Sequence, residues 1–381
     1  MMVKSPKSRV PELDGLRGLA ILFVVLFHYI SQEGATPAGT ANHFLQRFVI
    51  LGWSGVDLFF VLSGFLIGGI LMDARASVSY YRTFYARRFF RIIPIYYLWM
   101  TAYIALVGFA GATIQRLSNS GLAPPLGFPV YSYYLFLQNF RASGFPGLAG
   151  AWFGHLWSLA VEEQFYLISP LVVRFVSPRK LPYALAAVIA LAPALRTFLR
   201  LAAGATPSMV TVLMPSRADA LAVGMLLAAL WRRERVRTWF QDNIGKLYAA
   251  GGILSLSVLG LWIWAPNSGD LGMQISGFTC LAFFYACLLL LALLHPSGPV
   301  AALMRTAWLR ELGKLSYCIY IIHIVVNVGC HAVLLHKAPQ ISTAKGAVVT
   351  FFAAAVTYVA ARLSWLLIEH PLLRRGRAFK Y

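Results

Sequence analysis

Charged residues are scarce in this chain. Asp, Glu, Lys and Arg make up 12% of its 381 residues, whereas a soluble domain carries about 25%. Acidic residues are the scarcest, with 13 Asp and Glu against 33 Lys and Arg, so the formal net charge is +20. The low charge content excludes an ordinary soluble domain, and the basic excess needs a separate explanation.

Cysteine is also rare. The chain has four cysteines, Cys280 and Cys287 on one apolar stretch and Cys318 and Cys330 on another. They form no Cys-x-x-Cys pair and no spacing typical of metal ligands. We therefore expect free, buried thiols and no bound metal, rather than a disulfide framework.

Long apolar stretches are abundant. Hydrophobic residues make up 59% of the chain, and its mean hydropathy is +0.69. A helix that spans a bilayer needs about 20 mostly apolar residues. The sequence therefore predicts an all-α, polytopic integral membrane protein, a single membrane domain over residues 1–381. It has about ten transmembrane helices, near 15–31, 50–72, 92–110, 155–173, 182–202, 217–231, 247–265, 274–294, 315–335 and 346–368. The stretch 128–140 is too short to cross and is expected to be interfacial or re-entrant.

The basic residues follow the expected membrane topology. With ten spans, 24 of the 33 basic residues fall on the side of both termini and 8 on the opposite side. This asymmetry is the positive-inside pattern, so both termini are expected in the cytoplasm of a multi-pass cell-membrane protein. No helix-turn-helix, zinc or RNP pattern accompanies the basic clusters. We therefore expect a lipid bilayer around the chain and no nucleic-acid partner.

The first span carries two ionisable residues on one face. Arg17 and His28 are eleven residues apart, which on a helix is about 20° beyond three full turns and roughly 16 Å along the axis. Asp14 lies one turn before Arg17 and could pair with it or orient it. Ionisable residues within a membrane indicate function by default. The alternative is an interfacial arginine and a hydrogen-bonded core histidine.

The second and third spans add an acid and a basic pair. Asp57 lies just inside the outer boundary of its span, where it could be functional or a structural partner of an arginine. Arg88 and Arg91 share a helix face at the cytoplasmic end of the third span. They are either topology signals or a fork that binds phosphate groups.

The fourth and ninth spans carry further polar residues. Glu162 and Glu163 lie well inside a span, where each buried charge needs a partner. Adjacent residues differ by about 100° on a helix, so we expect only one of them to face any one site. A glutamate facing His28 could orient the imidazole; a purely structural role is the alternative. Tyr320 and His323, one turn apart, could be site residues or core polar contacts.

These segments, in this order, resemble the acyltransferase-3 family of integral membrane acyltransferases. The resemblance rests on six motifs spread over nearly the whole chain: Leu-Asp-Gly-Leu-Arg-Gly with the following His28, Gly-Val-Asp-Leu-Phe-Phe-Val-Leu-Ser-Gly-Phe, Arg-x-x-Arg-Ile-x-Pro, Trp-Ser-Leu-x-x-Glu-Glu-Gln-Phe-Tyr, Ser-Tyr-x-x-Tyr-x-x-His and Glu-x-Pro. The family moves acyl groups, commonly acetyl, from a cytoplasmic coenzyme A thioester to hydroxyls of extracytoplasmic sugars or small natural products.

The resemblance implies an O-acetyltransferase with acetyl-coenzyme A as donor, a carbohydrate or glycolipid acceptor and no metal. It implicates Arg17 and His28 as essential, Arg88 and Arg91 as donor-side residues, and Glu162 and Glu163 as site residues. With the positions of the polar residues on their helices, we expect the following roles: catalytic for His28, Glu162 and Glu163; donor-binding for Arg17, Arg88 and Arg91; supporting for Asp14, Asp57, Trp157, Tyr320 and His323. On this reading, loss of His323 or His370 leaves substantial activity. A proton-coupled transporter or flippase, and a lipid-linked glycosyltransferase, remain alternatives.

Overall fold

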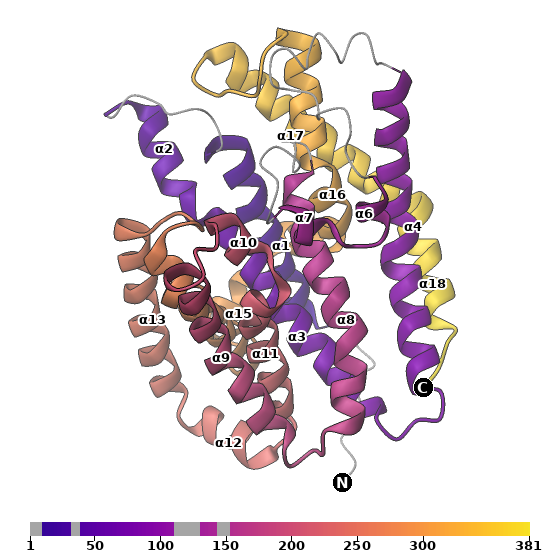
Figure 1. Cartoon of the computed structure of the whole chain (residues 1–381), viewed down its shortest axis with the longest axis vertical. Helices are drawn as coiled ribbons and strands as arrows, with labels where there is room; N and C mark the ends of the chain where they lie inside the picture. Colours follow the sequence, from indigo (N-terminus) through magenta and orange to yellow (C-terminus); the bar gives the residue numbers. More distant parts are fainter. Residues whose placement is uncertain (1–9, 32–38, 110–129, 143–152) are drawn as a thin grey trace.

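The computed structural model describes residues 10–31, 39–109, 130–142 and 153–381, and these residues form helices and no strand (Figure 1). The helices, some continued by a 3₁₀ or π-helical turn (η), are α1 (Pro11–Leu26), η1 (Phe27–Ser31), α2 (Ala41–Val49), η2 (Ile50–Ser54), α3 (Gly55–Ala74), α4 (Tyr80–Phe109), α6 (Tyr131–Tyr134), α7 (Gln138–Ala142), η3 (Gly154–Leu156), α8 (Trp157–Phe175), α9 (Leu181–Leu201), α10 (Pro207–Val212), α11 (Met214–Trp231), α12 (Glu234–Asp242), α13 (Ile244–Trp264), η4 (Met273–Gly277), α14 (Phe278–Leu294), α15 (Pro299–Met304), α16 (Ala307–Leu335), α17 (Ala344–Ser364), η5 (Trp365–Glu369) and α18 (His370–Arg377).

The long helices lie side by side along the long axis of the molecule (Figure 1). Within the described ranges, nine helical segments are long and apolar enough to cross a membrane. The predicted fourth span corresponds to α8, which is not among the nine and which carries Glu162, Glu163 and Arg174. The prediction of a polytopic all-α membrane protein is confirmed.

Two helices begin earlier than their apolar stretches suggest. Helix α4 starts at Tyr80 and α16 at Ala307, whereas the sequence predicted spans from residues 92 and 315. Hydropathy detects only the apolar part of a helix, while arginine and lysine are also good helix formers. Arg88 and Arg91 therefore belong to a continuous helix. Residues 130–142 form only the short helices α6 and α7, and residues 128–129 lie outside the described part.

Two pairs of helices cross in close backbone contact. A Cβ atom added to Gly18 of α1 would lie 1.9 Å from the carbonyl oxygen of Leu309, and one added to Gly313 of α16 would lie 1.8 Å from that of Asp14. Helices α3 and α11 show the same feature at Gly64 and Gly224, each 2.0 Å by this measure from a carbonyl oxygen of the other helix. Small residues allow membrane helices to approach this closely. The glycines therefore set the close spacing of α1 with α16 and of α3 with α11.

Helix α1 does not end as a regular α-helix. Its last turn, Phe27–Ser31, is π-helical and contains His28. Such turns are rare and occur frequently at functional sites. His28 Nδ1 lies 2.8 Å from the carbonyl oxygen of Val24, which holds the imidazole against its own helix.

Candidate active site

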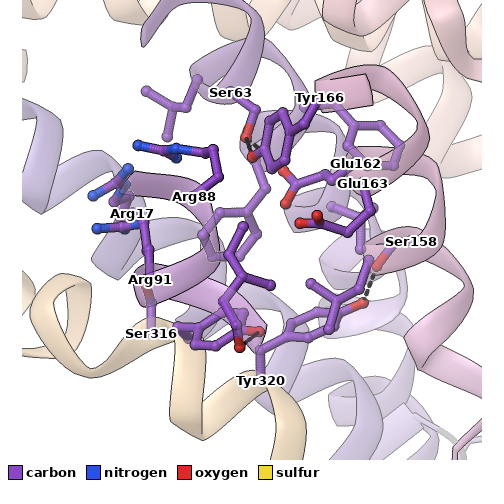
Figure 2. A pocket seen from close by; sticks show the side chains of 17 residues that line it. Arg17, Ser63, Arg88, Arg91, Ser158, Glu162, Glu163, Tyr166, Ser316 and Tyr320 are labelled. Atoms are coloured by element: carbon purple, nitrogen blue, oxygen red, sulfur yellow. Dashed lines mark hydrogen bonds between the residues drawn. The ribbon is translucent and has the colours of Figure 1, made fainter. Parts of the chain in front are cut away.

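A cavity opens between α1, α3, α4, α8 and α16 (Figure 2). Its empty volume is about 720 Å³, counting the part that opens to the outside. The residues that line it are Arg17, Val56, Phe59, Phe60, Leu62, Ser63, Arg88, Arg91, Ile92, Ser158, Leu159, Glu162, Glu163, Tyr166, Ser316, Tyr317 and Tyr320. Six of the eleven site residues expected from the sequence therefore meet there, although they come from four different helices.

The three arginines gather on one side of this cavity. Figure 2 shows the guanidinium groups of Arg17, Arg88 and Arg91 close together and apart from the carboxylates. Across the described residues, the ion pairs within 4 Å involve other basic side chains and none of these three. Three guanidinium groups without a carboxylate partner can bind the phosphate groups of a ligand, because their planar forks match phosphate oxygens.

Both glutamates line the cavity, which differs from the expectation that only one would face it. The cavity wraps around α8 from Ser158 to Tyr166, so it covers more than the 100° between adjacent side chains. Glu162 Oε1 accepts a hydrogen bond of 2.5 Å from Ser63 Oγ, which lies 3.1 Å from the hydroxyl of Tyr166. The hydrogen bond of Glu162 thus goes to Ser63, and not to His28.

Tyr320 closes the end of the cavity away from the arginines. Its hydroxyl donates to the carbonyl oxygen of His155 at 2.8 Å and lies 2.5 Å from Ser158 Oγ (Figure 2). On its other side, the Tyr320 ring lies 5.2 Å from the ring of His155 and 5.9 Å from that of His323. Tyr320 is therefore shared between the cavity and a cluster of histidines.

This histidine cluster contains His28, His155 and His323. The ring centroids of His28 and His323 are 4.9 Å apart, and His28 Nδ1 lies 3.2 Å from His323 Nε2. His28 and His323 are both site residues expected from the sequence. Loss of His323 was expected to leave substantial activity, and that expectation stays a prediction. His155 was not among the site residues expected from the sequence, where its one signal was a polar side chain two residues before Trp157.

The remaining supporting residues do not line the cavity. Asp57 Oδ1 pairs with Arg217 at 2.5 Å, and both side chains are almost fully buried. Trp157 packs against Phe60, with ring centroids 6.2 Å apart. Asp14 is buried at the crossing of α1 and α16, where its carbonyl oxygen faces Gly313. The contacts of Asp57 favour a structural role as the partner of an arginine.

A second cavity of about 630 Å³ adjoins the arginines at the start of α4. Its basic lining consists of Arg87, Arg88, Arg91 and Arg377, without an acidic residue. Arg88 and Arg91 therefore line both cavities. The wall from α18 and the following residues is held by Arg87, which donates to the carbonyl oxygen of Phe379 at 2.9 Å. Arg377 is far from α4 in sequence, so its pattern alone gave no reason to select it.

The site shows no metal-binding geometry. Over the described ranges, no group of three or more His, Cys, Asp or Glu side chains is arranged to hold a metal ion. In the histidine cluster, ring nitrogens of all three residues face backbone carbonyl oxygens rather than a common point.

Several proteins that are similar to this chain are named O-acetyltransferases. The O-acetyltransferase OatA of Staphylococcus aureus (strain NCTC 8325 / PS 47) is 28% identical over 98% of this chain and 58% of its own length. The peptidoglycan O-acetyltransferase OatA of Listeria monocytogenes is 27% identical over 97% of the chain and 57% of the relative. The putative peptidoglycan O-acetyltransferase YrhL of Bacillus subtilis is 27% identical over 96% and 55%.

The chain thus spans a little over half the length of these curated relatives. No solved structure matches it significantly. The sequence model of the acyltransferase domain, acyltransferase-3, matches residues 10–363, which include both cavities' arginines except Arg377 and the whole histidine cluster. By this match over nearly its entire length, the chain belongs to the acyltransferase-3 family of acyltransferase domains.

Proposed function

We propose that the protein is a membrane O-acetyltransferase that moves an acetyl group from cytoplasmic acetyl-coenzyme A to a hydroxyl of a carbohydrate on the outer side of the cell membrane. The observation that carries the proposal is one continuous arrangement. Three arginines that form no ion pair with another described residue stand at one end of the cavity, and a histidine cluster stands behind Tyr320 at the other. Two relatives are named as a peptidoglycan O-acetyltransferase and a putative peptidoglycan O-acetyltransferase, and these names support a glycan acceptor.

The donor enters from the arginine side. Coenzyme A carries a diphosphate and a separate phosphate on its nucleotide, and the described lining of the second cavity has four arginines and no Asp or Glu. Because Arg88 and Arg91 line both cavities, a ligand held by them can extend its thioester arm into the first cavity. The nucleotide then stays near α18, and the acetyl group approaches Tyr320.

His28 performs the proton transfer. The acceptor hydroxyl gives its proton to a ring nitrogen of His28 while its oxygen attacks the thioester carbonyl carbon. The carbon–sulfur bond then breaks, and the thiolate of coenzyme A takes the proton from His28. Glu162 and Glu163, on the cavity wall opposite the arginines, contribute negative charge and hydrogen-bond acceptors beside the thioester arm (Figure 2). Transfer through an acetylated His28 is the competing route.

The membrane orientation follows from the basic asymmetry. The arginine end of the cavity belongs to the cytoplasmic side, together with both termini. We expect a cysteine at Thr238, on the exposed face of α12, to react with a membrane-impermeant maleimide only after permeabilisation. A cysteine at Ser342, between α16 and α17, should react in intact cells. Reversed labelling would contradict the orientation and the cytoplasmic donor.

The function is tested with purified protein in lipid vesicles, acetyl-coenzyme A labelled in its acetyl group, and peptidoglycan fragments as acceptor. We expect labelled ester on the glycan and an equal amount of free coenzyme A thiol. The control is His28→Ala, which should form both products about 10²–10⁴-fold more slowly. A transporter or flippase would release no thiol, so absence of thiol release with every glycan of the host envelope would overturn the proposal.

A further inference from the structure

Three segments that are far apart in the sequence bring their imidazoles together. His28 comes from η1, His155 from η3 and His323 from α16, and their ring centroids lie 4.9 to 5.9 Å apart. Among the residues that the structure describes, no carboxylate makes a hydrogen bond or an ion pair with any of the three. The usual partner that orients a catalytic histidine is therefore not an acid here.

The backbone fixes which nitrogen of His323 carries its hydrogen. His323 Nδ1 lies 3.0 Å from the carbonyl oxygen of Ile319 and 2.9 Å from that of Tyr320. Carbonyl oxygens only accept hydrogen bonds, so Nδ1 must be the donor. In a neutral imidazole the other nitrogen then has the lone pair. Nε2 of His323 is therefore an acceptor, and it points at Nδ1 of His28 at 3.2 Å.

The neighbouring acceptors also determine which nitrogen of His28 carries its hydrogen. Its Nδ1 faces two acceptors, the carbonyl oxygen of Val24 at 2.8 Å and His323 Nε2. Nδ1 must therefore carry the hydrogen, and the lone pair of neutral His28 is on Nε2. Within the described part of the chain, His28 Nε2 has no hydrogen-bond partner.

His155 has the opposite arrangement. Its Nε2 lies 2.8 Å from the carbonyl oxygen of Tyr320 and must donate, which leaves the lone pair on Nδ1. That nitrogen is buried and has no partner in the described structure, and the residue is only 6% exposed. The cluster thus offers two unused lone pairs and no unused N–H group. A polar group that enters it must donate a hydrogen bond, as a hydroxyl does.

We infer that His323 is a positioning residue that makes Nε2 of His28 the reacting nitrogen, an inference that rests on the proposed acetyl transfer. The acceptor hydroxyl loses its proton to His28 Nε2, and its oxygen forms the new ester bond. The Nδ1–H group of the resulting imidazolium still donates a hydrogen bond to His323 Nε2, and this bond stabilises the positive charge. The proton on Nε2 then passes to the departing thiolate. His323 has the place that a carboxylate occupies in a serine hydrolase triad.

The matched variants are His323→Gln and His323→Met. Glutamine keeps an acceptor oxygen near the position of Nε2, whereas methionine has similar length and only a weakly accepting sulfur. We expect kcat of His323→Met to fall about 100-fold, the low end of the range for lost general-base catalysis. KM for acetyl-coenzyme A should stay within about threefold, because His323 does not line the donor cavities. His323→Gln should recover most of kcat.

Two results would overturn this inference. Wild-type kcat in His323→Met would mean that the contact with His28 is not used. Equal loss in both variants, with unfolding temperatures in detergent equal to that of the wild type, would mean that packing and not the acceptor atom matters. If both variants unfold, the inference is tested instead by the chemical modification of His28. That rate is then compared between the wild-type protein and the milder variant His323→Asn.

A chemical measurement separates this inference from the proposed function. Diethyl pyrocarbonate acylates an unprotonated imidazole nitrogen and needs no acetyl donor, and mass spectrometry locates the modified residue. We expect His28 to be modified several-fold more slowly in His323→Met, and also in His323→Asn, than in the wild type, with His323→Gln close to the wild type. If this pattern holds while wild type transfers no acetyl group, the proposed function fails alone. If transfer occurs but His28 reacts equally in all proteins, the role of His323 fails alone.

Discussion

Two regions of the protein bury several charged side chains, and only one of them neutralises its charges internally. Between α3, α9 and α11, Asp57 pairs with Arg217 at 2.5 Å and Asp219 with Arg196 at 2.9 Å, all with side chains at most 1% exposed. In the cavity beside α4 and α8, three arginines face two glutamates across open space (Figure 2). Paired charges belong to the fold, whereas charges held apart around a cavity need a ligand.

The difference appears in the hydrogen bonds as well. Arg196 also donates to the carbonyl oxygens of Gln274 and Ser216 and to Thr279 Oγ1. These partners leave Arg196 little capacity for a ligand. Substitutions in the paired region should therefore change stability, and substitutions around the cavity should change catalysis or donor binding.

The largest effect is expected at His28. His28→Ala should reduce acetyl transfer by about 10²–10⁴-fold, the contribution of a general base, without affecting membrane insertion. The measurement is the rate of ester formation with saturating donor, and the control is His370→Ala on the exposed start of α18. A loss well beyond this range, with acetyl-His28 found in wild type incubated without acceptor, would favour the covalent route. A His28→Ala protein with wild-type rate would contradict the whole mechanism.

In the paired region, Arg217→Met should destabilise the protein by about 3–5 kcal/mol, because it leaves Asp57 buried without its partner. The measurement is the thermal or denaturant unfolding of the protein in detergent. The double variant Asp57→Asn with Arg217→Met removes both charges and should recover much of the loss. If the single variant is as stable as the wild type, the distinction between the two regions is wrong.

A smaller effect is expected at the donor arginines. Arg91→Lys should raise KM for acetyl-coenzyme A about tenfold or more, because an ammonium cannot reproduce the bidentate fork and a charge-assisted contact contributes about 1.5–3 kcal/mol. Stability should not change. The matched control is Arg82→Lys, an exposed position on the same helix. An unchanged KM in Arg91→Lys would mean that the arginine only sets the topology.

The smallest effect is expected at the helix crossing. Gly313→Ala should destabilise the protein by about 1–3 kcal/mol, since the added methyl group overlaps the carbonyl oxygen of Asp14 and forces α1 and α16 apart. Gly329→Ala, on the same helix with nothing within 4 Å of the new Cβ, is the control and should be neutral or slightly stabilising. Equal unfolding temperatures for the two variants would show that the crossing tolerates expansion.

The class of fold and the helical character of the expected spans could be predicted, because the length of an apolar stretch is a local property of the sequence. The membrane orientation, which rests on the basic residues, stays a prediction. The starts of α4 and α16 were missed because hydropathy does not detect their polar first turns. The neighbourhood of Glu162 and Glu163 was misjudged because the shape of a cavity depends on five helices at once.

The contacts of the individual site residues were harder to predict from the sequence. That Arg17, Arg88 and Arg91 share a cavity agrees with their assignment to one ligand. However, nothing in the sequence pairs Asp57 with Arg217, and His155 was not selected at all. These contacts join residues more than 100 positions apart, and they depend on how the helices are rotated about their axes. A single sequence carries no signal for that rotation.

The glycine crossing of α1 and α16 has a consequence for the contact between His28 and His323. Gly313 precedes His323 by ten residues, about 15 Å along the helix axis. A tilt of about 5° at the crossing would displace His323 by about 1.3 Å, enough to break its hydrogen bond of 3.2 Å with His28. Because backbone meets backbone there, rotation of side chains cannot absorb such a tilt. The proposed proton-transfer geometry therefore depends on a distant point where no side chain stands, and we expect pressure and bilayer thickness to change the rate by acting there.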